Sequence, residues 1–192
     1  MRTTLIKKKR LTRLVGISLL TALNCILAQI MIPFPVPVTM QTFAVLLSLM
    51  LLPKLDGVIC TALYVFMGAV GLPVFSGFTG GIGHVLGLGG GYLVGFPIMG
   101  LIYVFFRSLF GDGRKRQLIY GAVSLLSMYI IAVLWIAFIY TGADVGSISA
   151  IILAYALPFV LPDAVKLFLA YILTNKLKEI FKFGKEENRQ DQ

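Results

Sequence analysis

Six apolar segments dominate this chain and restrict it to folds that a lipid bilayer can accommodate. About 20 helical residues are needed to cross a hydrocarbon core of about 30 Å. Hydrophobic residues make up 58% of the chain and charged residues only 13%, which departs strongly from a soluble domain of this length. We therefore expect an all-α membrane protein with six transmembrane helices. The expected spans are residues 14–32, 39–52, 58–70, 90–106, 118–140 and 148–174.

The basic residues lie on alternate connections between these segments. If the N-terminus is cytoplasmic, the inner connections hold 16 of the 17 lysines and arginines. Cytoplasmic loops of membrane proteins carry such an excess of Lys and Arg. We therefore expect a single polytopic membrane domain over residues 1–192, with both termini in the cytoplasm. Its parts are a basic N-terminus (1–13), a six-helix bundle (14–175) and a tail (176–192).

The net charge of +9 does not indicate a nucleic-acid partner, because the chain has no basic stripe interleaved with exposed aromatic residues. Cys25 and Cys60 lie in apolar segments and are expected to pack as small core residues. A single histidine, His84, without a nearby cysteine makes a zinc site improbable. We expect no metal and no cofactor.

Lys166 is the one basic residue that membrane topology does not explain, and Asp163 lies three positions before it in the last apolar segment. This spacing places both side chains on one face of a helix. A charge at the centre of a transmembrane helix costs roughly 2.5–3.5 kcal/mol on insertion scales, so the pair needs a reason to be there. It either binds a ligand or joins helices as a structural ion pair. Pro158 and Pro162 predict a kink or break just upstream.

Residues 71–91 form the least regular part of the chain, with nine glycines among 21 residues. Irregular backbone at membrane depth is tolerated where protein buries it or where it lines a cavity. We therefore expect a folded loop over a site, the alternative being a mobile extracellular loop. Gly87, Gly91 and Gly95 recur every fourth residue and predict a flat packing face.

Several polar and aromatic residues begin their segments at one common depth, in the outer half of the bundle. Thr39 is expected to cap the second helix, after three prolines that end the preceding one. Gln41, Tyr92 and Tyr155 are each compatible with interfacial anchoring, but their shared depth predicts a small-molecule pocket. The chain lacks a nucleophile–histidine pairing, an HExxH motif and a Walker loop, so catalysis has little support.

Ser18 and Ala22 lie four residues apart in the first apolar segment. Small residues at this spacing permit close approach of a second helix, although a lipid-facing helix is equally compatible with them.

Four motifs together resemble the BioY family, the biotin-specific S (substrate-binding) subunits of energy-coupling-factor (ECF) ABC transporters. The resemblance extends over about residues 14–175. The motifs are Pro35-Val-Pro-Val-Thr-Met-Gln-Thr, Gly71-Leu-Pro-Val-Phe, Gly90-Gly-Tyr-Leu-Val-Gly-Phe and Pro162-Asp-Ala-Val-Lys.

The resemblance implies an S-component fold in a prokaryotic plasma membrane that binds biotin from outside with high affinity. A transmembrane coupling protein (the T component) and two ABC-type ATPases would then drive release inward, so the chain itself would not be an enzyme. In the family, the acid and base of the last helix are associated with biotin binding, and they match Asp163 and Lys166. Ser18 and Ala22 match small residues that meet the coupling protein.

The resemblance also suggests specific contacts. Asp163 would accept a hydrogen bond from a ureido N–H of biotin, and Lys166 would donate one to the ureido carbonyl. Alternatively, Lys166 would bind the carboxylate tail. The other expected ligand neighbours are Thr39, Gln41, Gly90, Gly91, Tyr92, Trp135 and Tyr155. A secondary transporter or channel that works alone, and a membrane enzyme, are the alternative functions.

Overall fold

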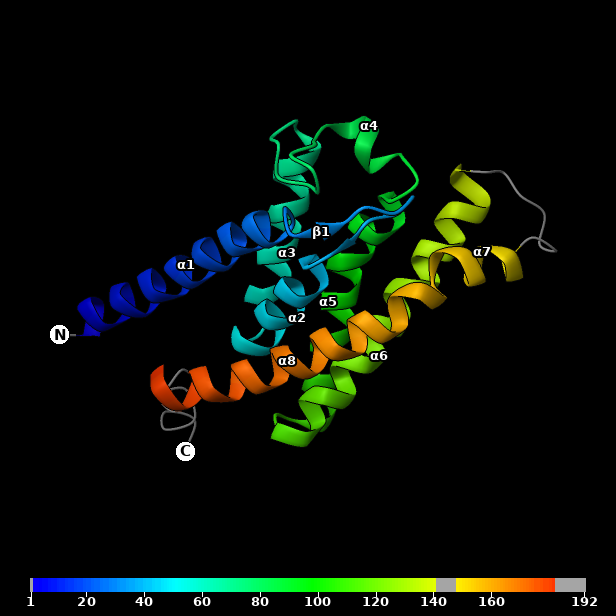
Figure 1. Cartoon of the computed structure of the whole chain (residues 1–192). Helices are drawn as coiled ribbons and strands as arrows, with labels where there is room; N and C mark the ends of the chain where they lie inside the picture. The colour runs from blue at the N-terminus through cyan, green and yellow to red at the C-terminus, as the bar shows by residue number, and fades with distance from the viewer. Residues whose placement is uncertain (1, 141–147, 182–192) are drawn as a thin grey trace.

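The structure is a computed structural model that describes residues 2–140 and 148–181, and it consists mainly of helices (Figure 1). A two-stranded antiparallel hairpin follows the first helix. The end of α6 widens into a π-helix, η1. The elements are α1 (Arg2–Leu27), β1 (Met31–Ile32), β2 (Val38–Thr39), α2 (Gln41–Leu51), α3 (Asp56–Ala69), α4 (Ile82–Val85), α5 (Gly90–Phe110), α6 (Arg114–Leu134), η1 (Trp135–Tyr140), α7 (Ile148–Tyr155) and α8 (Leu157–Phe181).

Four helical stretches are long and apolar enough to cross a membrane: Arg10–Leu27, Gly90–Phe110, Arg114–Ile139 and Leu157–Glu179. The chain is therefore a multi-pass membrane protein. The other two expected spans correspond to shorter helices, α2 with 11 residues and α3 with 14. Nine of the residues of α2 are buried. Because α2 packs against α1, α3, α5 and α8, its composition is set by neighbouring helices more than by lipid.

Several predicted helix ends need correction. The first helix begins at Arg2, since Lys and Arg favour helix, and it ends at Leu27 where the prediction continued it to residue 32. A turn at residues 28–29 and strand β1 occupy the difference. Met40, and not Thr39, is the N-cap residue of α2. Thr39 is already in β2, although its hydroxyl still accepts the backbone N–H of Gln41 at 3.2 Å.

The last apolar segment is broken at Ala156, between α7 and α8, as its prolines predicted. Pro158 lies in the first turn of α8, where its missing N–H leaves no helical hydrogen bond unmade. Pro162 lies inside α8. The helix also continues past the predicted end at residue 174, up to Phe181. The remainder of the predicted tail, 182–192, and the turn at 141–147 lie outside the described residues.

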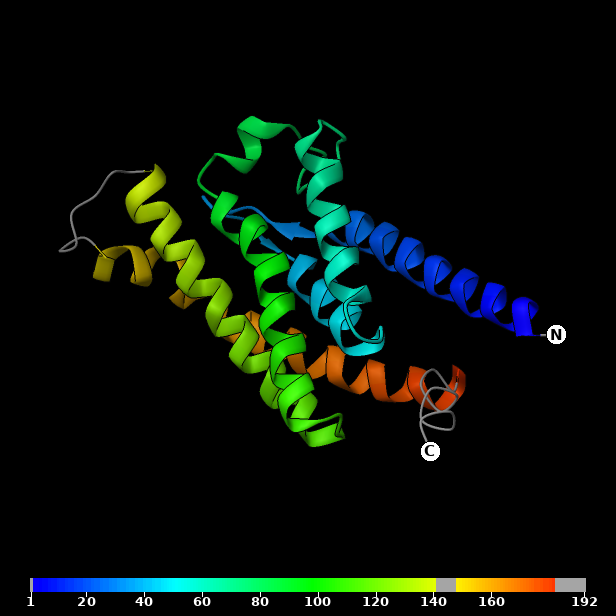
Figure 2. The ribbon, with the colours of Figure 1, turned by 180° about the vertical axis from the view of Figure 1, so that it is seen from behind.

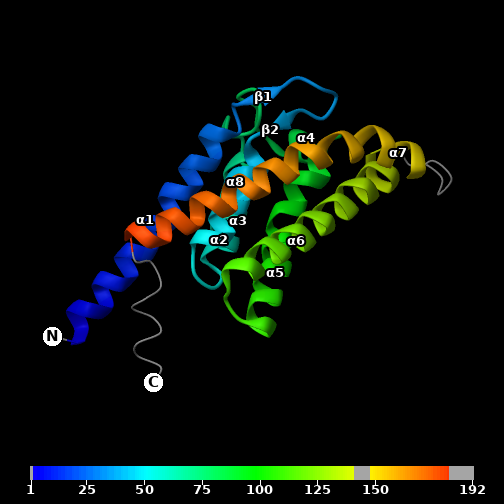
Figure 3. The same ribbon diagram turned by 60° about the horizontal axis from the view of Figure 1, so that its bottom comes forward.

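Glycines let the helices pack closely. A Cβ added to Gly95 would lie 3.0 Å from Met128, and one added to Gly91 would lie 2.8 Å from the Cα of Ala132, both on α6. The predicted packing face is therefore confirmed for Gly91 and Gly95, whereas Gly87 lies before α5 begins. Figure 2 shows the resulting antiparallel pair of α5 and α6, and Figure 3 shows α8 lying across α2 and α6.

The two ends of the bundle differ in character. The hairpin, α4 and the glycine-rich segment lie in the upper half of Figure 1, with the hairpin below the other two. The start of α1, the end of α8 and the turn between α5 and α6 point towards the opposite side. Arg13 there forms a two-pronged ion pair with the fully buried Asp56, at 2.5 and 2.8 Å. The basic connections thus gather away from the glycine-rich end.

Replacement of Gly57 by alanine should destabilise the protein, because the new Cβ would lie 2.9 Å from both the Cα of Leu49 and the carbonyl oxygen of Ser48. Overpacking of this kind costs about 1–3 kcal/mol. We expect the midpoint of thermal unfolding in detergent to fall by several degrees. Gly83→Ala is the matched control, because nothing lies within 4 Å of its added Cβ. Equal midpoints for the two variants would contradict the described packing of α2 against α3.

Candidate ligand-binding site

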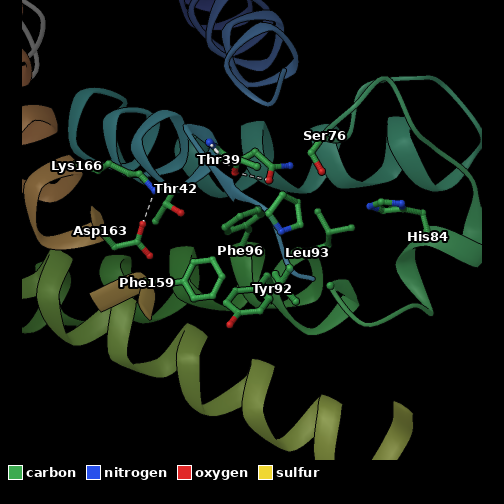
Figure 4. A pocket seen from close by; sticks show the side chains of 14 residues that line it. Thr39, Thr42, Ser76, His84, Tyr92, Leu93, Phe96, Phe159, Asp163 and Lys166 are labelled. Carbon is green, nitrogen blue, oxygen red and sulfur yellow. Dashed lines mark hydrogen bonds and ion pairs between the residues drawn. The ribbon is translucent and has the colours of Figure 1, made fainter. Parts of the chain in front are cut away.

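A cavity lies between α2, α5 and α8 (Figure 4). Two connections cover it, the turn between β1 and β2 and the glycine-rich segment of residues 71–91. Its volume is about 50 Å³. Both apolar and polar side chains face it, and they come from segments far apart in the sequence. The lining residues are Val36, Pro37, Thr39, Gln41, Thr42, Ser76, His84, Gly89, Tyr92, Leu93, Phe96, Phe159, Asp163 and Lys166.

The ion pair of α8 occupies one end of this cavity. The ammonium nitrogen of Lys166 lies 2.7 Å from Oδ1 of Asp163, and the hydroxyl of Tyr129 donates to Oδ2 at 2.6 Å. Asp163 is 3% exposed and Lys166 is 6% exposed. Both carboxylate oxygens are thus engaged. Within the described part of the chain, the ammonium has no second hydrogen-bond partner, so two of its three N–H donors are available to a ligand.

A chain of hydrogen bonds fixes the wall beside α2. The hydroxyl of Thr39 donates to Oε1 of Gln41 at 2.7 Å, and Nε2 of Gln41 donates to the hydroxyl of Tyr64 at 2.5 Å. Tyr64 in turn donates to the carbonyl of Val74 at 3.2 Å. This chain links β2 and α2 to α3 and to the glycine-rich segment. The predicted residues Thr39 and Gln41 therefore stand at the cavity in a fixed orientation.

Tyr92, in the first turn of α5, lines the same cavity. Its ring centroid lies 5.8 Å from that of Phe159, and its hydroxyl donates to the backbone carbonyl of Tyr155. Tyr155 itself does not line the cavity; it packs beside the buried residues Ile151 and Ala156. The structure thus joins Tyr92 and Tyr155, but it places only the first at the cavity wall.

Trp135, Gly90 and Gly91 lie behind the cavity, where α5 begins and α6 ends. The indole N–H of Trp135 donates to the carbonyl of Gly87 at 3.2 Å. A Cβ on Gly91 would lie 2.5 Å from the Cβ of Trp135. A Cβ on Gly90 would lie 1.7 Å from the carbonyl oxygen of Val85. These three residues hold the end of the glycine-rich segment against the bundle and do not line the cavity.

The glycine-rich segment is a folded cover, anchored at both α1 and α3. Gln29 of the turn after α1 donates to the carbonyl of Phe75 at 3.0 Å and accepts the backbone N–H of Phe78 at 2.8 Å. The ring of Phe75 fills the space left by Gly68, where an added Cβ would lie only 2.0 Å away. His84 stacks on Phe75, with centroids 5.2 Å apart. Burial lowers the pKa of His84 below its usual value.

Sequence reasoning missed several of the lining residues. Phe96 and Phe159 lie one helical turn from Tyr92 and Asp163, so helix periodicity would have found them. Periodicity does not single out Thr42, because neighbouring residues of a helix point in different directions. Ser76 and His84 belong to the segment that we expected over a site. No local pattern in the sequence predicts the contact of Tyr129 with Asp163, because 34 residues separate the two.

The arrangement suits binding of a compact polar group. Asp163 can only accept hydrogen bonds and Lys166 can only donate them, so the pair complements a group that carries a donor beside an acceptor. Aromatic rings and Leu93 supply apolar contact next to it. Because the ions are nearly free of water, hydrogen bonds to them are stronger than at a solvated surface.

Ser18 and Ala22 lie away from the cavity, on the exposed side of α1. Leu19 and Ile26 on the same side are 67% and 63% exposed. This side of α1 is therefore covered by no other described element of the chain.

Comparisons with known proteins agree with this picture. The chain is 42% identical over 164 residues to the probable biotin transporter BioY of Pyrococcus horikoshii, covering 84% of this chain and 93% of that protein. It is 36% identical over 169 residues to the biotin transporter BioY of Thermotoga maritima, covering 88% and 96%.

The fold matches a solved one. It resembles the crystal structure of the S-component for biotin from an ECF-type ABC transporter with a TM-score of 0.79, at 22% identity, covering 90% of this chain and 93% of the other. A sequence model of the BioY family matches residues 1–183. The chain therefore belongs to the BioY family.

Proposed function

We propose that this chain is the S component of an ECF-type transporter, and that it binds biotin from the outer side of the membrane and takes part in its uptake. The observation that carries the proposal is the buried pair of Asp163 and Lys166 at the wall of a cavity, in a chain of the BioY family. The named biotin transporters among its relatives cover most of the chain, which supports the same ligand.

The ureido group of biotin fits the pair chemically. It carries two N–H donors and one carbonyl acceptor, so Asp163 would accept from an N–H and Lys166 would donate to the carbonyl. Charge-assisted hydrogen bonds of this kind are roughly twice as strong as neutral ones. The alternative places the carboxylate of biotin on Lys166. It is less favourable because Asp163, whose Oδ1 lies 2.7 Å from the ammonium, already neutralises that charge, so the pair has little net attraction for a second carboxylate.

The membrane arrangement that we propose uses six spans, with α2 and α3 completing the four longer ones. Both termini and the turn between α5 and α6 would then face the cytoplasm of a prokaryotic cell, as the positions of the basic residues suggest. A coupling protein would contact the exposed side of α1 at Ser18 and Ala22. Two partner ATPases would supply the energy for release.

Neutralising either ion should remove most of the affinity for biotin. Asp163→Asn and Lys166→Met each remove a charged partner of the ureido group, and a hydrogen bond to a charged group contributes about 1.5–3 kcal/mol. We expect the Kd of purified protein, measured by titration calorimetry, to rise by at least about tenfold in each variant.

Asp56→Asn is the matched control for that experiment. It breaks a buried ion pair with Arg13 that lies outside the cavity, so it should lower the thermal midpoint and leave the Kd unchanged. Asp163→Asn or Lys166→Met proteins that bind biotin normally would make the α8 pair a purely structural one.

The cavity is smaller than the several hundred Å³ of a typical small-molecule site, so the covering segment must move to admit biotin. We expect bound biotin to slow amide hydrogen exchange in residues 71–91 several-fold, because the ligand then holds the segment in place. Exchange in the middle of α6 serves as the internal control. Identical exchange of residues 71–91 with and without biotin would contradict a moving cover.

A further inference from the structure

The cavity has two polar ends, and only one of them is used by the ion pair. Asp163 and Lys166 lie at one end, and Ser76 and His84 lie towards the other (Figure 4). Between the ends lie Thr42 and the aromatic rings of Tyr92, Phe96 and Phe159. A ligand that fills the cavity would therefore meet polar side chains at both of its ends and mainly apolar surface along its middle.

Hydrogen-bonding groups at the second end are unused. Ser76 is 8% exposed, and neither its hydroxyl nor the ring nitrogens of His84 have a hydrogen-bond partner among the described residues. The imidazole is held in place by stacking on Phe75. Burial lowers the pKa of His84, which favours the neutral ring, and a neutral imidazole offers one N–H donor and one acceptor.

We propose that Ser76 and His84 form a second subsite that binds the carboxylate of the ligand by hydrogen bonds from the hydroxyl and the imidazole N–H. This inference rests on the proposed function, since it assumes a ligand whose polar head occupies Asp163 and Lys166. A carboxylate left without donors in an apolar cavity would carry a large desolvation cost. At the first end Asp163 already neutralises Lys166, so the free donors at the far end are the better partners for a second anion.

The two ends of the cavity belong to different structural elements. Asp163 and Lys166 belong to the long helix α8, whereas Ser76 and His84 belong to the covering segment, residues 71–91. A ligand that bridges them would tie the cover to the bundle through its acid group. Preference for a ligand with a free carboxylate over its neutral amide would then depend on Ser76 and His84 of the covering segment and not on α8.

Affinities for biotin and for biotin amide, which lacks the charge, test this assignment. His84→Phe keeps a ring to stack on Phe75 but removes the N–H donor. We expect this variant to bind biotin about tenfold more weakly, as for loss of a hydrogen bond to a charged group. Its affinity for the amide should stay within about twofold of the wild-type value. Ser76→Ala should give the same pattern with a smaller change.

Two further variants serve as controls. Ile82→Ala alters the same short helix at a side chain that is 62% exposed and outside the cavity, so neither affinity should change. Lys166→Met should weaken both ligands by the same factor, because the ureido group is common to them.

Equal loss of both ligands in His84→Phe, or loss of neither, would overturn the second subsite. Selective loss of biotin in Lys166→Met would also overturn it, since Lys166 would then bind the carboxylate. Failure of the proposed function itself would be distinguishable, because the wild-type protein would then bind neither ligand.

Discussion

An ammonium and a carboxylate held almost free of water in the same helix determine what the rest of this structure must provide. Removing two charges from water is costly. Their mutual attraction offsets that cost only when further hydrogen bonds satisfy the remaining lone pairs of the carboxylate and N–H donors of the ammonium. Tyr129 supplies one such bond to Asp163. Lys166 lines the cavity and uses one N–H donor for Asp163, and in our account biotin accepts a hydrogen bond from one of the others.

The backbone near Asp163 and Lys166 places these two side chains where neighbouring helices can supply such hydrogen bonds. The break at Ala156 and the prolines after it start α8 at a point from which Asp163 and Lys166 face α2 and α6. Gly121 on α6 makes room there, since an added Cβ would lie 2.5 Å from Leu167. The hydrogen-bonded chain from Thr39 to Tyr64 then joins the site to its cover.

Local patterns in the sequence predicted the features that depend on residues close in the chain. The break near Pro158, the packing of Gly91 and Gly95, and the shared face of Asp163 and Lys166 are of this kind. Contacts between distant residues were not predictable. Strands of only two residues carry no periodicity, so the sequence predicts β1 as the end of the first helix and Thr39 of β2 as the start of the second. The bonds from Tyr129 to Asp163 and from Arg13 to Asp56 join residues 34 and 43 positions apart.

The structure of the purified protein with biotin bound would test the central claim most directly. The account predicts ureido nitrogen and oxygen atoms within about 3.2 Å of the Asp163 carboxylate and the Lys166 ammonium, respectively. Biotin bound elsewhere, with the two side chains still paired only to each other and to Tyr129, would contradict it.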